Sequence, residues 1–336
     1  MLRIILYRLL QGAVVILIVS ALTFALLGAA GGDALSSLSS DPLVSEATLR
    51  GLRHTYGLDE PLPVRYWRWL AGVLRGEMGY SLYYHTPAWS IIGPRLLNTL
   101  ALATLALLIS MTISLALGWL AARRAGGWAD RLAGAVILLA SSSPRIVLAL
   151  IALALVARSP SFLMSGGAAA VGASPGISLM RIFIPATILS VPLVALFLAQ
   201  ARDGLLLSMR EDFVQVARAK GLSERAVILR HALRAALNPL ITIFGLSLGS
   251  LISGSVMVET VLGWPGLGQL SVVAAQARDV PLLMGVVLIT ATAVLVGNLV
   301  ADILLCLNDP RLRQGAGKAV ASGGAAAAAG AATPLS

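Results

Sequence analysis

Six long apolar stretches constrain this chain of 336 residues more than any other feature of its sequence. A helix needs about 20 predominantly apolar residues to cross the hydrocarbon core of a bilayer. Only 12% of the residues are charged, about half the fraction of a soluble domain, and 58% are hydrophobic. The sequence therefore predicts an all-α polytopic membrane protein of about six transmembrane helices. We expect them at Leu9–Leu27, Leu100–Ala121, Leu132–Val156, Ile182–Leu205, Leu237–Val258 and Leu282–Leu307.

The Lys and Arg residues predict the orientation of these helices. The short loops on one side carry most of them, including Arg3 and Arg8, Arg123 and Arg124, and the basic segment between the fourth and fifth stretches. Because cytoplasmic loops are enriched in Lys and Arg, both termini are expected in the cytoplasm. The net charge of +10 is spread over loops rather than one face, so no nucleic-acid partner is expected.

The expected organisation has four parts. Residues 1–30 form an N-terminal transmembrane helix, and residues 31–98 an extracytoplasmic segment. Residues 99–308 form a five-helix core with a cytoplasmic loop at 202–236, and residues 309–336 a cytoplasmic, largely disordered tail rich in Ala and Gly. The first stretch also resembles a secretory signal, but its length exceeds the 7–15 apolar residues typical of one, which favours an uncleaved helix.

The extracytoplasmic segment contains an aromatic run, Tyr66-Trp67-Arg68-Trp69, followed by Leu70, Val73 and Leu74. This pattern predicts an amphipathic helix on the membrane surface, since Trp and Tyr favour that interface. A small cap that packs on itself fits the same residues.

The sequence offers no metal or nucleotide site. The single Cys306 lies in an apolar run, and His54, His85 and His231 are far apart. Gly317-Lys318-Ala319 lacks the upstream Gly and the hydroxyl of a phosphate-binding loop. We therefore expect no cofactor on this chain and no catalytic residue.

The basic loop predicts a helix, a turn and a second helix. Acidic residues suit the start of a helix and basic residues its end, Gly221 suits the C-cap, and Ser223 suits the next N-cap. Phe213, Val216 and Ala217 form a narrow apolar stripe that would fit a groove on another protein.

Ala217-Arg218-Ala219-Lys220-Gly221, with Pro239 further on, resembles the coupling loop of ABC importer permeases. The form without a Glu in the Ala-rich part is similar to B-type permeases of dipeptide, oligopeptide and nickel importers. The resemblance implies a type I importer permease fold and a short helix that docks on a cytoplasmic ATPase. The residues that it places at this docking site are Glu211, Asp212, Phe213, Val216, Ala217, Arg218, Ala219, Lys220, Gly221 and Ser223. It also implies two such ATPases, which would bind ATP and Mg, a second homologous permease and an extracytoplasmic substrate-binding protein as partners.

Further segments resemble the same family in the same order. They run from Leu52-Arg53-His54-Thr55-Tyr56-Gly57, through Glu259-Thr260-Val261-Leu262-Gly263-Trp264, to Asp309-Pro310-Arg311. Gly31-Gly32-Asp33-Ala34 departs from the Pro-Gly-Asp-Pro that is usual there. The resemblance places the loop with Glu259, Trp264 and Gly266 at the outer mouth of the pathway. An ordinary turn with a buried Trp is the other interpretation.

Arg145 lies about a dozen residues into the third stretch, near the middle of the membrane if that stretch is one helix. An Arg at that depth costs at least about 2.5 kcal/mol and should face a cavity or a partner. We expect it to line the substrate pathway and attract a carboxylate; pairing with Asp302, or a position nearer the surface, is the alternative. Ser143, Asn298 and Asp302 are further pathway candidates. Ser143 can instead bond its own helix, and Asn298 and Asp302 can join two helices.

The preferred function is a permease subunit that forms half of the pathway for di- or oligopeptides in an inner-membrane ABC importer. Nickel chelates, opines and glycosides are alternative substrates of the same architecture. A secondary transporter would need more intramembrane carboxylates and repeated halves, and a membrane enzyme would need a catalytic constellation, neither of which the sequence offers.

Overall fold

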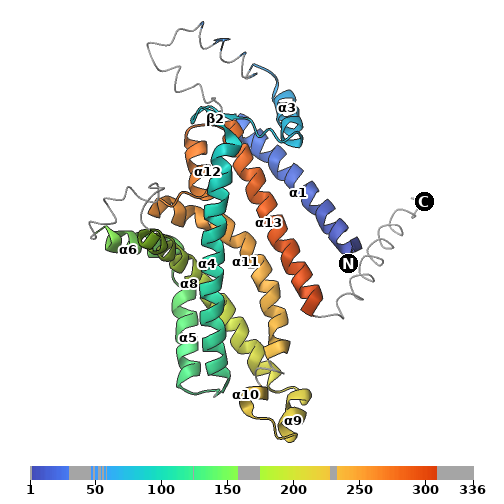
Figure 1. Cartoon of the computed structure of the whole chain (residues 1–336), viewed down its shortest axis with the longest axis vertical. Helices are drawn as coiled ribbons and strands as arrows, with labels where there is room; N and C mark the ends of the chain where they lie inside the picture. The colour runs from blue at the N-terminus through green and yellow to red at the C-terminus, as the bar shows by residue number, and fades with distance from the viewer. Residues whose placement is uncertain are drawn as a thin grey trace, which may run out of the picture.

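The computed structural model describes residues 2–29, 59–123, 125–157, 175–227 and 233–308, together with residues 47, 50, 51, 54 and 57. Within these ranges the chain is helical apart from one short hairpin (Figure 1). The helices are α1 (Leu2–Ala29), α3 (Leu62–Leu74), α4 (Ala88–Arg123), α5 (Trp128–Ser141), α6 (Arg145–Val156), α8 (Pro175–Ser208), α9 (Asp212–Ala219), α10 (Glu224–Val227), α11 (Leu233–Leu262), α12 (Leu267–Gln276) and α13 (Val280–Asn308); the strands are β1 (Tyr80–Ser81) and β2 (Thr86–Pro87). The predicted tail lies outside the described residues.

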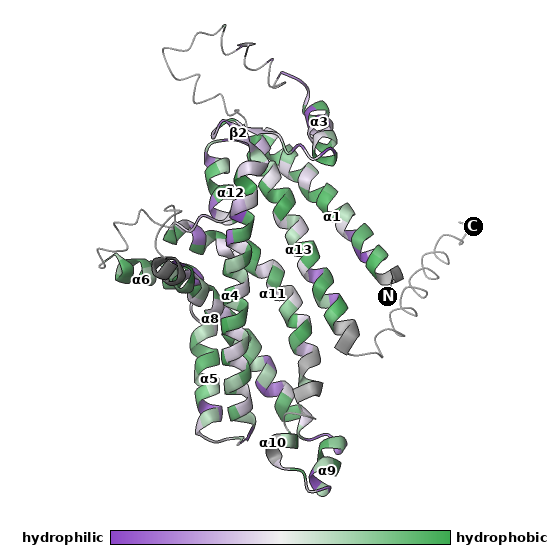
Figure 2. Cartoon of the chain, in the orientation of Figure 1, coloured by the Kyte–Doolittle hydropathy of each residue, from purple (hydrophilic) through white to green (hydrophobic). Residues whose placement is uncertain are grey.

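The described helices fit an all-α membrane protein, as predicted. Four of them, α1, α4, α8 and α13, are each long and apolar enough to cross a bilayer. The pair α5 and α6, and the two parts of α11 at Pro239–Gly245 and Ser247–Leu262, raise the number to six if each bent pair is one span. Green, hydrophobic residues cover much of these helices in Figure 2, which suits contact with lipid.

The third predicted stretch is not one straight helix, because α5 and α6 meet at an angle of 90°. Pro144 lacks an N–H and drives the residue before it toward extended backbone, so a helix ends there. The hydroxyls of Ser141 and Ser143 donate to the carbonyl oxygens of Leu138 and Leu139, at 3.0 and 2.7 Å. These serines therefore bond the end of their own helix, as one of the two interpretations predicted.

Two segment boundaries differ from the prediction. Helix α4 begins at Ala88, ten residues before the predicted end of the extracytoplasmic segment. At 1.5 Å per residue, its 36 residues span about 54 Å, well beyond a hydrocarbon core of about 30 Å. Helix α8 continues through Ser208 and α11 begins at Leu233, so both ends of the predicted loop 202–236 are helical.

The core of the bundle lies where α4, α8 and α11 pack together. Gly118 of α4 faces Ala201 of α8 so closely that a Cβ at Gly118 would lie 3.1 Å from the Ala201 Cβ. Small residues allow such approach, and packing of this kind drives association of helices in lipid. Large side chains such as Leu102, Phe197 and Leu251 fill the space between the three helices.

Helix α1 lies at the edge of the bundle beside α13, as Figure 1 shows. Its outer end contacts α3, where the Tyr66 hydroxyl lies 3.0 Å from the Ser20 hydroxyl and the Tyr66 ring packs edge-on against Phe24. Trp67, on another face of α3, is exposed. Helix α3 thus packs against α1 on one side. Its position on the membrane surface stays a prediction.

Candidate functional site

The loop after α8 folds as the predicted helix, turn and helix. Glu211 occupies the N-cap position of α9, and Gly221 follows its last turn with a φ of +78°. The N–H of Leu222 donates to the Ala217 carbonyl at 3.4 Å, and that of Gly221 to the Arg218 carbonyl at 2.9 Å. These two bonds form the helix-ending motif that needs a left-handed residue at the position of Gly221. The Ser223 hydroxyl accepts the Ala226 N–H at 3.4 Å and so caps α10, as predicted.

Helix α9 has two different apolar faces. Val214 and Ala217 are buried, whereas Phe213 is 44% and Val216 53% exposed. Residues three apart lie on one side of a helix, so 213 and 216 form one face and 214 and 217 another. The predicted stripe is therefore corrected: Ala217 belongs to the inner face, and the outward stripe consists of Phe213 and Val216.

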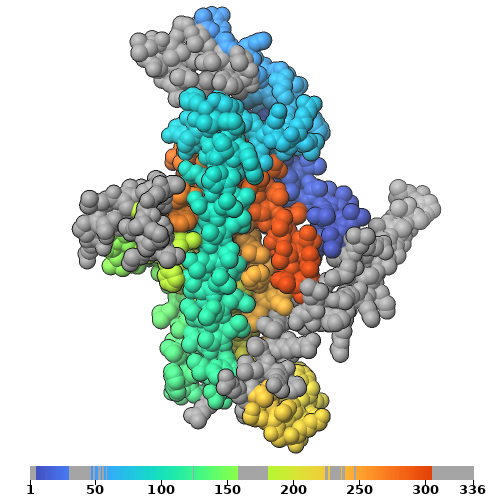
Figure 3. Space-filling view, in the orientation of Figure 1, coloured from blue at the N-terminus to red at the C-terminus, as the bar shows by residue number. Residues whose placement is uncertain are grey.

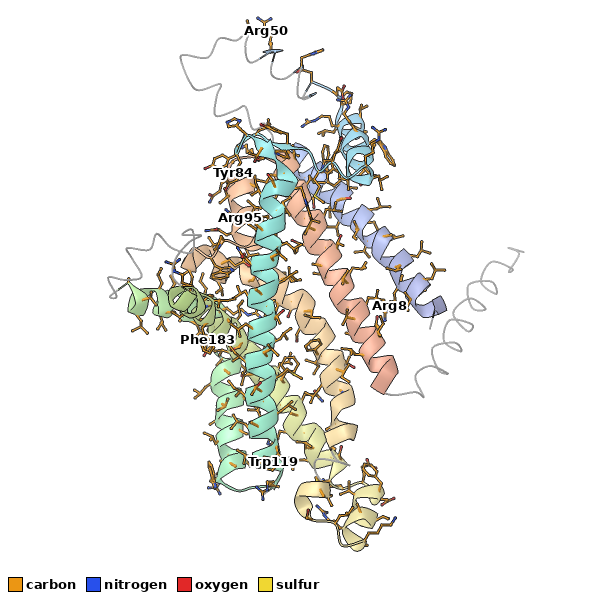
Figure 4. All side chains as sticks on the ribbon, in the orientation of Figure 1. Arg8, Arg50, Tyr84, Arg95, Trp119 and Phe183 are labelled. Atoms are coloured by element: carbon orange, nitrogen blue, oxygen red, sulfur yellow. The ribbon has the colours of Figure 1, made fainter. Side chains whose placement is uncertain are left out.

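The buried face of α9 attaches it to the membrane helices. We call these residues the inner-end cluster: Ala122 of α4, Leu205 of α8, Ala236 of α11, Val214 and Ala217 of α9, and Val227 of α10, with Trp119 and Met209 packed against them. Figure 4 labels Trp119 near this end of α4, and Figure 3 shows α9 projecting beyond the ends of the helices. A force on α9 therefore acts on three long helices at once.

An ion pair braces the same end of the bundle. The Nε of Arg202 on α8 lies 2.6 Å from Oδ1 of Asp130 on α5, and both side chains are largely buried. The other oxygen of Asp130 accepts the N–H of Gly126 at 2.9 Å, in the turn between α4 and α5. Sequence reasoning treated Arg202 only as a basic residue of the loop and did not find this contact.

Arg145 is the first residue of α6, directly after the bend. Its guanidinium packs against Gly254 of α11, where an added Cβ would lie only 1.9 Å from Nη1. Within the described part of the chain, no carboxylate forms an ion pair with it. Asp302 instead pairs with Arg8 of α1, with Arg8 Nε and Asp302 Oδ2 3.0 Å apart, so the alternative pairing of Arg145 with Asp302 is wrong.

The other pathway candidates do not gather around Arg145. Ser143 lies at the bend and bonds its own helix. Asn298 and Asp302 line a groove between α13 and α1, together with Arg8 and Gln11. Figure 4 labels Arg8 at this place. Arg145 packs on α11 and Asp302 on α1, so the four candidates do not form one site.

Glu259, predicted at the outer mouth, is buried in the last turn of α11. Its carboxylate accepts the N–H groups of Gly268 and Gln269 at 2.7 and 3.1 Å, in the first turn of α12. It also accepts the Thr99 hydroxyl of α4 at 2.9 Å, while the Leu267 N–H donates to the Thr99 oxygen at 2.8 Å. A carboxylate is favoured at a helix N-terminus, so Glu259 fixes the start of α12.

The glycines of this loop leave room for the Glu259 carboxylate. A Cβ at Gly266 would lie 2.4 Å from it, and one at Gly268 would lie 2.5 Å from the backbone of Val256. The backbone N–H of Trp264 donates to the Glu259 carbonyl at 2.8 Å, and Gly263 has a φ of +67°. The loop is thus held in one shape by its own backbone contacts.

Sequence reasoning missed the polar residues that dock α4 on this loop. Arg95 donates to the side chain of Gln269 at 3.0 Å, and Asn98 donates to the Pro265 carbonyl at 2.9 Å. With Thr99 they occupy positions i, i+3 and i+4 of a helix, a spacing that predicts one polar face. This spacing is visible in the sequence, but most of it lies in residues 31–98, which were predicted as an extracytoplasmic segment and not as part of a transmembrane helix.

Asp279 is a second missed residue. It is buried and accepts the Ser81 hydroxyl at 2.6 Å, the Tyr83 N–H at 3.1 Å and the Leu282 N–H at 3.1 Å. It therefore caps α13 and ties the β1–β2 hairpin to it. An Asp placed before Val280 and Pro281 at the start of an apolar run is a typical N-cap signal.

Comparison with known proteins gives a consistent result over the chain. Residues 114–314 match the family model described as the binding-protein-dependent transport system inner membrane component, and residues 1–115 match its N-terminal family. The oligopeptide transport system permease protein AppB of Bacillus subtilis is 34% identical over 308 residues, covering 91% of this chain and 97% of that protein. The glutathione transport system permease protein GsiC of Salmonella paratyphi A is 32% identical over 313 residues, covering 93% and 99%.

Proposed function

This chain belongs to the family of binding-protein-dependent transport system inner membrane components, and on that premise we propose that it forms half of a pathway for peptides. It is an inner-membrane permease subunit of an ABC importer, which works with ATPase and substrate-binding partners. The names of its relatives, an oligopeptide and a glutathione permease, support a peptide or small peptide derivative as the substrate. A second, homologous permease supplies the other half.

The outward face of α9 is the observation that supports this function best. Phe213 and Val216 are exposed although both are apolar, whereas the opposite face of the same short helix is buried in the inner-end cluster. An exposed apolar stripe on a short helix is typical of a helix that docks in a groove of another protein. We assign that groove to a cytoplasmic ATPase subunit.

The inner-end cluster connects this contact to transport. Closure of two ATPases on ATP moves α9, and α9 carries the ends of α4, α8 and α11 because their side chains pack together. A packed cluster transmits displacement since its close-packed side chains leave little free space. This chain binds the peptide and positions it in the pathway, and its partner subunits hydrolyse ATP.

We propose that Arg145 attracts the substrate within the pathway. It is a cation at a break in the membrane helices, near α11, and within the described residues it has no carboxylate partner. A peptide's carboxylate would satisfy it. We limit the proposed pathway contacts to Arg145 and Ser143, because Asp302 is already paired with Arg8 and lies beside Asn298 away from the bend.

The loop that Glu259 fixes is the proposed contact for the substrate-binding protein at the outer mouth. Rigidity suits that task, since a pre-organised loop loses little entropy on binding.

The test of the docking face is Val216→Asp, with Gln215→Asp as its matched control. Both variants add one negative charge to an exposed position of α9, but only Val216 belongs to the stripe. We expect Val216→Asp to reduce co-purification of the ATPase subunits and ATP-dependent uptake of labelled peptide by roughly tenfold or more, and Gln215→Asp to leave both near wild type. Undiminished co-purification and uptake in Val216→Asp would refute this assignment of the face.

A further inference from the structure

The groove between α1 and α13 is built like a binding site for a membrane lipid. It has a volume of about 610 Å³ and runs along two helices from Arg8 to Val15 and from Asp302 to Val294. The helices touch at Gly12, where a Cβ would lie 1.5 Å from the Leu295 Cδ1, so their surfaces meet there and leave space beside the contact.

The lining of the groove changes from polar to apolar along its length. The polar side chains, Arg8, Gln11, Asn298 and Asp302, all lie at one end beside Leu9, Leu10 and Leu299, and the other end holds only Val14, Val15, Val294 and Leu295. A groove with polar groups at one end and aliphatic groups at the other has the same polarity sequence as a phospholipid. A buried helix contact would have no need of this gradient.

The polar end lies within one helical turn of the ends of the two candidate spans, Ile5–Ala29 and Val280–Leu304. Arg8 is six residues from the start of α1, and Asp302 six residues from the end of α13, which at 1.5 Å per residue is about 9 Å along each helix. Both ends lie on the same side of the bundle (Figure 1). The apolar end therefore points toward the middle of the bilayer, as an acyl chain from that leaflet does.

The charges at the polar end select the headgroup. Asp302 takes the Nε and Nη2 of Arg8, at 3.0 and 3.4 Å, which leaves further N–H groups of the guanidinium free for a phosphate. The Arg8 side chain is 53% and that of Asp302 29% exposed, so both are accessible from the groove. Asp302 has remaining lone pairs for a cation. A headgroup with a phosphate and an ammonium complements this pair.

We propose that this groove binds a phosphoglyceride with a primary ammonium headgroup, its phosphate on Arg8, its ammonium on Asp302 and one acyl chain along Val14, Val15 and Leu295. The lipid fills a gap that would otherwise lose packing contacts, and it joins α1 to the rest of the bundle. The site is separate from the proposed peptide pathway, since Arg145 packs on α11.

The test measures lipid retained by the assembled transporter in dodecyl maltoside, by native mass spectrometry after addition of equal amounts of phosphatidylethanolamine, phosphatidylcholine or phosphatidylglycerol. Phosphatidylcholine keeps the phosphate but has no N–H donor, and phosphatidylglycerol has no ammonium. We expect phosphatidylethanolamine to be retained at least about threefold more than either. Equal retention of the three lipids would overturn the proposed headgroup.

Two variants locate the site. Arg8→Gln should lower retention of phosphatidylethanolamine severalfold, while Arg131→Gln, an exposed arginine on α5, should not. Arg8→Gln also breaks the ion pair with Asp302, so a second variant is needed that leaves this pair intact. Val15→Phe fills the groove with a larger side chain. Its control is Leu22→Phe, which makes a similar change at an exposed position of α1 outside the groove. Loss of lipid in Val15→Phe but not in Leu22→Phe supports the site. Unchanged retention in Val15→Phe, or a crosslink from Val15→Cys to the partner permease, overturns it.

Discussion

At the scale of single residues, the informative side chains are charged groups buried in an apolar protein. Glu259 accepts hydrogen bonds from Thr99, Gly268 and Gln269, and Asp279 from Ser81, Tyr83 and Leu282, so both hold loops of the bundle. Arg145 differs from both, because its guanidinium packs on a glycine and forms no ion pair among the described residues. The two bonded carboxylates stabilise structure, and we propose that Arg145, without an ion pair among the described residues, binds a passing ligand.

Replacing Glu259 with Gln should destabilise the permease. The side-chain amide of Gln would turn its own N–H toward the N–H and O–H groups that now donate to the Glu259 carboxylate. Hydrogen bonds to a charged group contribute about 1.5–3 kcal/mol each to stability. We expect a lower melting temperature in detergent, measured by differential scanning fluorimetry. Thr99→Val should have a similar effect, because Thr99 bridges Glu259 and Leu267. Thr260→Val, an exposed neighbour on the same helix, is the control; equal melting temperatures of all variants would contradict the role of Glu259.

Replacing Arg145 with Gln should change which peptides are transported. A charge-assisted hydrogen bond to a carboxylate contributes about 1.5–3 kcal/mol, so the preference for free over amidated C-termini should fall roughly tenfold or more. Uptake of the two peptide forms into proteoliposomes measures this ratio. Arg145→Lys should keep part of the preference. The pathway role is lost if Arg145→Gln transports both forms in the wild-type ratio.

At the scale of elements, the lengths of the apolar stretches predicted the helices but not the angles between them. The stretch from Leu132 to Val156 has the composition of one span, yet Pro144 divides it into two helices at 90°. The signal for the break was in the sequence, whereas the angle depends on packing against α8 and α11. The early start of α4 was missed because Gly93, Pro94, Arg95 and Asn98 resemble a polar loop until their partners in α12 and its preceding turn are known.

The docking helix was predicted more fully because its signals are local. Caps and a positive-φ glycine depend on neighbouring residues, and the structure places them where the pattern indicated. Which of Phe213, Val216 and Ala217 faces outward depends instead on the inner-end cluster, whose members come from α4, α8 and α11. Long-range partners such as Arg8 and Asp302 carry no signal in the spacing of residues.

Replacing Asp279 with Ala should loosen the β1–β2 hairpin. Three donors lose their acceptor, and each unsatisfied buried donor costs about 1–3 kcal/mol. Hydrogen exchange followed by mass spectrometry should show at least about fivefold faster exchange at residues 80–87. The control is Asp203→Ala, an exposed residue of α8 far from the hairpin in sequence. Exchange at wild-type rate in Asp279→Ala would show that the hairpin is held by other contacts.

At the scale of the whole molecule, the two functional ends lie at opposite ends of the bundle. The hairpin, α3 and the end of α12 lie at one end, and α9 and α10 at the other (Figure 1). The long helices α4, α8 and α11 pack in two separate hydrophobic clusters, the larger one around Phe197 and the inner-end cluster. We propose that these packed helices carry motion of α9 toward the loop that Glu259 fixes.

The orientation can be tested with single cysteines after Cys306, the chain's only cysteine, is replaced by Ala. Tyr83→Cys lies in the hairpin and Gln215→Cys on α9, both at exposed positions. A membrane-impermeant thiol reagent should label Tyr83→Cys in intact spheroplasts and Gln215→Cys only after permeabilisation. The reverse pattern would place the docking face on the wrong side for an ATPase.

The Arg8–Asp302 pair also has a consequence for how the protein is made. The two residues are 294 positions apart, so Arg8 leaves the ribosome long before its counter-ion. At roughly 5–20 residues per second, the first helix spends roughly 15–60 s in the bilayer before its partner emerges. During that interval the arginine must be accommodated by the insertion machinery or by surrounding headgroups, and only the arrival of the final helix completes its neutralisation.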